Sequence, residues 1–115
     1  MIEKSVYFDR LGFAVQYFIG QNAKDNFDIL DLASPDDWWF HVLNKPSCHV
    51  IAKLPGKLDR HDLRFVKKQG AVLCRQHSSS SIADSSKEKI MYAKVKYVQK
   101  TDIVGQVHVE HYSLI

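Results

Sequence analysis

The chain has 115 residues, of which 45% are hydrophobic and 25% are charged, a composition that is ordinary for a globular domain. A chain of this length buries roughly two thirds of its unfolded surface, enough for one core, so we expect a single domain over residues 1–115. The apolar runs are shorter than the ~20 residues that a membrane helix requires. Residues 1–5 have neither the basic start nor the apolar stretch of a signal peptide.

Charge and cysteine content indicate which partners and which compartment to expect. The net charge is +3 and the isoelectric point is near 8.9, which allows a polyanionic partner without requiring one. The two cysteines, Cys48 and Cys74, form no CxxC pair. We therefore expect a reduced, intracellular protein, cytoplasmic or nuclear, with no membrane association.

The first elements are two strands and a short helix. Val6–Asp9 and Phe13–Ile19 read as strands around a tight turn for which Gly12 supplies a positive φ. Asn22 is a suitable cap for a helix over Ala23–Leu32.

The middle of the chain predicts a hairpin and a long helix. Trp38–Leu43 and Cys48–Lys53 are β-rich runs on either side of a four-residue loop. From about Asp59 to Gln76, apolar residues recur with the helical period.

The C-terminal part predicts a loop and two strands. Ser78–Lys89 is polar and reads as a loop, whereas Met91–Val98 and Val104–Val109 read as strands. The order β-β-α-β-β-α-β-β indicates a small α+β domain with a largely antiparallel sheet. The long helix is expected to pack against one face of that sheet.

The long helix carries the clearest charge pattern. At ~100° per residue, its basic residues occupy a sector of roughly 100° beside the apolar stripe. Such a face can follow a phosphate backbone, or it can serve only as a solvated outer face. The residues are Arg60, Arg64, Lys67, Lys68 and Arg75.

A second basic group is predicted on the strand that follows. Strand alternation places Tyr92, Lys94 and Lys96 on one face. A tyrosine beside two lysines suits base stacking combined with phosphate contact, although a half-buried strand with lysines in water fits equally well.

The segment Asp36–His41 is the most unusual, because two tryptophans and a phenylalanine follow one another. A hairpin loop centred on Lys45 places His41 directly across from His49. The pair could belong to a metal site, although only two ligands are evident, or act as acid and base with Asp36 or Asp37. In the third alternative, one histidine has a structural hydrogen bond and the other forms a recognition surface with an exposed Trp39.

Together, these segments resemble the NFACT-R family. The blocks that carry the resemblance are Ile19–Asn26, Asp36–His41 and His49–Ile51, followed in the same order by Leu73–Ser78, Val95–Lys100 and Gly105–Val107. NFACT-R is the RNA-binding domain on the C-terminal side of ribosome quality-control factors, and it also occurs alone. The resemblance covers about residues 6–115. It implies an α+β fold, no established catalysis, and RNA binding in a tRNA or ribosomal context.

The resemblance also implies candidate nucleic-acid contacts, which are Asn22, Lys24, Asn26, Asp37, Trp39, His41 and His49. This chain departs from the family at Gln21, where a basic residue is usual, and at Ser47, where glycine is common. The first change removes about one phosphate contact, and the second reshapes the hairpin turn. The other regions of the large factors have no counterpart in these residues, so we do not expect this chain to bridge ribosome and tRNA as they do.

We therefore expect a non-enzymatic module, without metal or cofactor, that binds RNA such as tRNA or rRNA. DNA is a variant of this expectation, because phosphate contacts do not depend on the 2′-hydroxyl. An adaptor that docks on a ribosome-associated protein stays open, and it would show exposed Trp39 and Tyr92 and scattered basic residues. A metal-dependent hydrolase that uses His41, His49 and Asp37 also stays open.

Overall fold

The computed structural model describes residues 1–79 and 88–115. In this part of the chain one antiparallel sheet has the strand order β1-β2-β4-β3-β5-β8. Its strands are β1 (Ile2–Phe8), β2 (Phe13–Gly20), β3 (Trp38–Val42), β4 (His49–Lys53), β5 (Ile90–Lys94) and β8 (Ser113–Leu114). Most of the loop predicted over Ser78–Lys89 lies outside the described residues.

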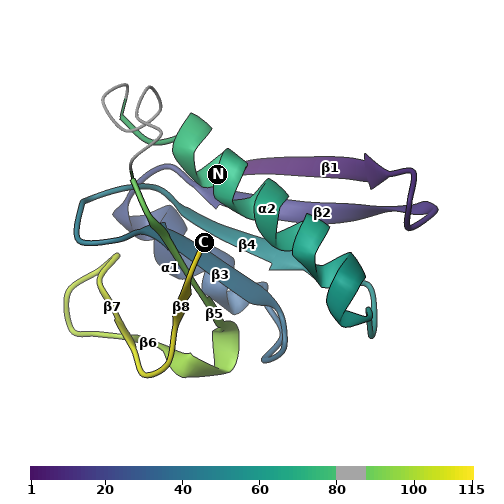
Figure 1. Cartoon of the computed structure of the whole chain (residues 1–115). Helices are drawn as coiled ribbons and strands as arrows, with labels where there is room; N and C mark the ends of the chain where they lie inside the picture. The colour runs from purple at the N-terminus through teal and green to yellow at the C-terminus, as the bar shows by residue number, and fades with distance from the viewer. Residues whose placement is uncertain (80–87) are drawn as a thin grey trace.

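Helices cover both faces of the sheet, as Figure 1 shows. The long helix α2 (Arg60–Gln76) crosses the front of the sheet, and α1 (Ala23–Asp31) lies behind it. A small hairpin of β6 (Val98–Lys100) and β7 (Val107–Val109) completes the second layer. No helix of the described residues has the length and apolar character needed to cross a membrane.

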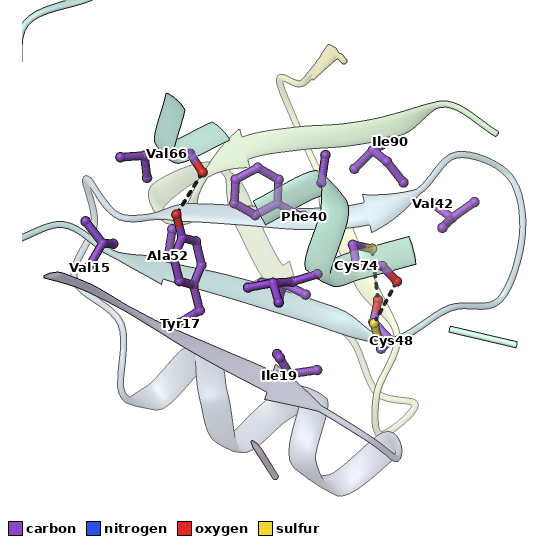
Figure 2. Close-up of a cluster of buried hydrophobic side chains, with 13 residues drawn as sticks. Val15, Tyr17, Ile19, Phe40, Val42, Cys48, Ala52, Val66, Cys74 and Ile90 are labelled. Carbon is purple, nitrogen blue, oxygen red and sulfur yellow. Dashed lines mark hydrogen bonds between the residues drawn. The ribbon is translucent and has the colours of Figure 1, made fainter. Parts of the chain in front are cut away.

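Two apolar clusters hold the layers together, one on each face. The cluster under α2 includes Tyr17, Phe40 and Leu73, and the Tyr17 hydroxyl donates to the Val66 carbonyl at 2.9 Å (Figure 2). The cluster under α1 and the small hairpin includes Trp39. Because strand side chains alternate between faces, consecutive residues of β3 contribute to opposite clusters.

Local signals explain where both helices begin. The Asn22 side chain accepts a hydrogen bond from the Asp25 backbone nitrogen at 2.8 Å, and Asp59 accepts one from Asp62 at 2.7 Å. These caps satisfy backbone donors that a helix start leaves free. Both predicted helices are confirmed, as is the α+β class with its long helix on one face. Gly12 has the expected positive φ of 74°.

The predicted strand over Met91–Val98 is wrong beyond Lys94. The chain leaves the sheet there and forms a short 3-10 helix, η1 (Val95–Tyr97). The backbone nitrogens of Val95 and Lys96 donate to carbonyls of the loop before β3, at 2.9 and 3.0 Å. These contacts turn the chain away from the sheet, so alternation does not hold beyond Lys94.

The other strand boundaries also differ from prediction. Strand β1 begins at Ile2, four residues before the predicted start. The predicted strand Val104–Val109 shrinks to β7, because Gly105 has φ of 87° and lies in the preceding turn. Strand β8 was not predicted, and it adds the last strand to the sheet beside β5.

Candidate nucleic-acid interface

The histidine pair predicted from the hairpin is formed. Phe40 pairs with Val50 in the β3–β4 register, and the next position brings His41 opposite His49. The two imidazole centroids are 4.8 Å apart, in an edge-to-face arrangement.

Trp39 lies beneath this pair and not at the surface. Its side chain is 1% exposed, so the expected exposed Trp39 is wrong. The small hairpin and α1 cover this face of β3, which places the indole in the second apolar cluster. Trp39 Nε1 donates to His49 Nδ1 at 3.2 Å, which confirms that one histidine of the pair is structural.

The hydrogen bonds fix the proton positions of both neutral rings. His49 Nδ1 accepts from an indole that can only donate, so the proton of His49 is on Nε2. Burial, aided by the neighbouring His41, lowers the pKa of His49 to about 3. His41 Nδ1 lies 2.6 Å from the Val42 carbonyl, which can only accept, so its proton is on Nδ1. Burial lowers the pKa of His41 as well.

These histidines line a cavity of about 870 Å³, within the usual range for small-molecule sites. We call it the histidine cavity. Five segments that are distant in sequence meet around it: the start of α1, the β3–β4 hairpin, the end of α2, the start of β5 and the β6–β7 turn. Its lining includes Asn22, Asn26, Trp39, His41, His49, Met91, Gln106 and Val107.

Asn26 is the most constrained polar residue of this lining. It is 9% exposed, and its Oδ1 is buried without a hydrogen-bond partner in the described part of the chain. The absence of a side chain at Gly20 makes room for it, because a Cβ there would overlap the Asn26 carboxamide. A buried amide with unused hydrogen-bonding capacity is uncommon. Asn26 remains a candidate contact because it lines the cavity, although its Oδ1 is enclosed beside Gly20.

Two of the candidates implied by the resemblance lie elsewhere. Lys24 is exposed on α1 and pairs with Asp28 at 2.8 Å. Asp37 is buried at the opposite end of β3, where it accepts from the backbone nitrogens of Ser34 (2.7 Å) and Leu54 (2.9 Å). Asp37 and His41 are four strand residues apart, a separation of roughly 13 Å.

This placement bears on the hydrolase alternative. Lys53 pairs with the Asp37 carboxylate at 3.1 Å, so Asp37 is engaged in fixing the loop before β3. The described residues contain no group of three or more histidine, cysteine or acidic side chains that could hold a metal. The hydrolase therefore has no observation in its favour among these residues.

The basic residues of α2 lie on the other face of the sheet. Arg60, Arg64 and Lys68 are exposed. Arg75 is half-buried at the helix end, where its Nη2 donates to the Glu88 carbonyl at 2.6 Å. Arg75 thus ties α2 to the chain that enters β5, whereas the other three are free to face solvent.

Lys67 joins this helix to an aromatic patch on the sheet. Its ammonium lies 4.5 Å from the centroid of the Trp38 ring and 4.9 Å from that of Tyr92, distances typical of cation–π contacts. Lys94 and Lys96 flank the same two rings in a shallow pocket of about 210 Å³. We call these five residues the basic–aromatic face. The Asp36 carboxylate lies 3.7 Å from Lys94 and 3.6 Å from Lys96.

The candidate residues thus fall into two groups on opposite faces of one sheet. Asn22, Asn26, Trp39, His41 and His49 line the histidine cavity, and the lysines adjoin Trp38 and α2. Sequence reasoning did not propose Trp38 or Gln106 as site residues. Side-chain alternation in β3 places Trp38 on the face opposite to Trp39, and this signal could have identified Trp38 as a candidate for the other face. No local signal marks Gln106, which reaches the cavity from the β6–β7 turn.

Comparison with protein-family models gives no match, and comparison with curated proteins gives none. Among solved structures, the C-terminal part of the fibronectin/fibrinogen-binding protein from Streptococcus suis is similar, with a TM-score of 0.78 over 98% of this chain. The sequences are 22% identical. The match covers 43% of that chain, so this chain spans less than half of its length. At this identity the similarity establishes a shared α+β fold, and nothing more about this chain.

Proposed function

We propose that this domain binds RNA through the basic–aromatic face, without catalysing a reaction. The observation that carries the proposal is the position of Lys67 over Trp38 and Tyr92, beside Lys94 and Lys96. Cations next to aromatic rings supply phosphate contacts and stacking platforms at once, the combination that single-stranded nucleic acids require. Arg60, Arg64 and Lys68 extend the positive charge along α2.

The resemblance to NFACT-R supports the same proposal. It implies RNA binding in a tRNA or ribosomal context, and its motif residues Asn22, Asn26, His41 and His49 gather around one cavity. A role beside the ribosome, alone or with a ribosome-associated protein, is part of the proposal. An intracellular compartment, cytoplasmic or nuclear, is also part of the proposal, and the two free, buried thiols at Cys48 and Cys74 support it.

The adaptor alternative gains less support. It would show exposed Trp39 and Tyr92 and scattered basic residues, but Trp39 is 1% exposed and Tyr92 is half-buried. The basic residues of α2 and β5 adjoin one aromatic patch. A protein partner on this face therefore enters as an outcome of the test below.

The test is fluorescence anisotropy of labelled single-stranded RNA, tRNA and sequence-matched DNA at 50 and 200 mM salt. If four phosphates are neutralised, the slope of log K against log salt is about −2.8 for a single strand, or roughly 50-fold weaker binding at the higher salt. A preference for RNA or tRNA over DNA would identify the natural ligand class. Absence of binding to every nucleic acid at tens of micromolar protein and 50 mM salt would refute the proposal and leave the adaptor.

Variants test the surface itself. Arg64→Glu combined with Lys67→Glu replaces two cations by anions, so affinity at 50 mM salt should fall by at least a hundredfold. A matched control for one of these changes is Lys4→Glu, compared with the single variant Lys67→Glu. Lys53 is not used in a control, because it pairs with Asp37. Lys4 is exposed on β1, at the other edge of the sheet. Equal losses in the two single variants would show that only net charge matters and would remove this face from the proposal.

A further inference from the structure

The histidine cavity has a chemistry different from that of the basic–aromatic face. Among the described residues that line it, the one formally charged side chain is Lys45, which is paired with Glu88. The other polar groups are amides, hydroxyls, imidazoles and the Cys48 thiol. At neutral pH the cavity is therefore poor in charge, which disfavours a phosphate or a carboxylate as its main occupant.

The histidine pair presents complementary hydrogen-bonding groups. With its proton on Nε2, His49 offers a donor there, and His41, whose proton is on Nδ1, offers an acceptor at Nε2. The structure gives neither Nε2 atom a hydrogen-bond partner among the described residues. Two rings with centroids 4.8 Å apart thus bring one donor and one acceptor into the same cavity, and these are the two kinds of group that alternate along the edge of a nucleobase.

The remaining lining combines aromatic, apolar and amide groups. The His41 ring is stacked on Trp39 with an interplanar angle of 8° and a centroid distance of 5.6 Å. Met91 and Val107 contribute apolar surface, and Asn26 contributes a carboxamide to the lining, although its Oδ1 is enclosed beside Gly20. Stacking surface combined with amide groups is how proteins hold unstacked bases.

We propose that the histidine cavity receives one unpaired nucleobase, read through its hydrogen-bonding edge by His41, His49 and Asn26. This inference rests on the proposed RNA binding and adds to it a site on the opposite face of the sheet. The phosphates of the strand contact the basic–aromatic face, and the base in the cavity gives the domain a preference for RNA with an unpaired nucleotide. A free nucleoside carries the same chemistry, so the experiment must separate the two sources.

The two tryptophans provide a separate reporter for each face. Trp38 lies on the basic–aromatic face, and Trp39 donates to His49 at the cavity, so their indole N–H signals in 1H–15N spectra report the two sites independently. At pH 7.5, the protein is titrated with the four ribonucleosides, a single-stranded RNA and an abasic oligonucleotide of equal length. We expect RNA to shift both indole signals, the abasic oligomer to shift Trp38 alone, and at least one nucleoside to shift Trp39.

Variants keep the test decisive. His41→Phe retains a ring on Trp39 but removes the acceptor, and Gln106→Ala trims an exposed turn residue of the lining. His41→Phe should weaken nucleoside affinity, followed by the Trp39 shift, about fivefold or more, corresponding to one lost hydrogen bond. Gln106→Ala should also weaken it, because it removes part of the cavity wall. Lys67→Glu should leave it unchanged. Because Gln106→Ala removes an exposed side chain, it stays informative even if His41→Phe fails to fold.

The outcomes distinguish the two proposals. If RNA shifts Trp38 and neither RNA nor any nucleoside at millimolar concentration shifts Trp39, the cavity inference is overturned while RNA binding stands. If a nucleoside shifts Trp39 but RNA binds nowhere, the base chemistry is right, and the source is a free nucleoside in place of an RNA strand. If no ligand shifts either indole, both proposals fail.

Discussion

Acidification should destabilise the fold through His49. The pKa of this imidazole is about 3 in the folded protein, against 6.5 for an ordinary histidine, because burial disfavours its charged form. The unfolded chain therefore binds more protons than the folded one between these values, and stability falls as pH drops below about 6.5. From pH 7 to pH 5 the loss amounts to about 2 kcal/mol, which corresponds to roughly 6–10 °C in Tm for a domain of this size.

The assay is thermal unfolding followed by circular dichroism at half-unit steps from pH 7.5 to 5. The lower limit stays above the range in which carboxylates titrate. His49→Gln retains an oxygen acceptor for Trp39 Nε1 and does not titrate, so its curve should be flatter even if its stability at pH 7 is lower. His41 and His77, whose pKa values are also lowered by burial, leave a residual slope in the variant. Parallel curves for the two proteins would refute the role given to His49.

Three further changes test other parts of the structure. A glycine-to-alanine change normally stabilises a helix, but at Gly70 the new Cβ would overlap the Phe40 ring. We therefore expect Gly70→Ala to lower the free energy of unfolding, measured in urea, by about 1–3 kcal/mol. Gly56→Ala, where the Cβ meets open space, should leave that free energy unchanged. Asp37→Asn should cost about 1.5–3 kcal/mol of stability, because it weakens charge-assisted hydrogen bonds. Its RNA affinity, measured by anisotropy at a temperature where the variant is folded, should be unchanged, and a selective loss of affinity would return Asp37 to the binding site. Asp36→Asn removes the carboxylate beside two lysines and should raise RNA affinity severalfold at 50 mM salt, and a decrease would contradict the proposed phosphate contacts.

Much of the fold follows from local signals. The apolar period from about Asp59 to Gln76 predicts α2 with nearly its observed bounds, Arg60–Gln76. The His41–His49 pair follows from a symmetric hairpin loop, because the register of a hairpin is fixed by its turn. These features depend on residues that are close in sequence.

The predictions that were wrong concern features that depend on contacts between distant segments. The alternating sequence pattern of the strand continues past Lys94, but hydrogen bonds to carbonyls of the loop before β3 bend the chain into η1. Alternation also separates Trp38 from Trp39 without saying which face of β3 a second layer covers. That layer comes from α1 and the β6–β7 hairpin, so the burial of Trp39 could not be predicted from its own neighbourhood.

The alternation of side chains along β3 places the two proposed binding surfaces on opposite faces of the sheet. A ligand held at the basic–aromatic face leaves the histidine cavity open, and a strand that engages both has to cross from one face of the sheet to the other, for example around the β8 edge, the nearer edge of the sheet to β3. The second contact is then intramolecular, and its strength is set by the effective concentration that the intervening nucleotides impose. Length of single strand, more than base sequence, would decide whether an RNA gains avidity from this domain or occupies one face and leaves the other for a second molecule.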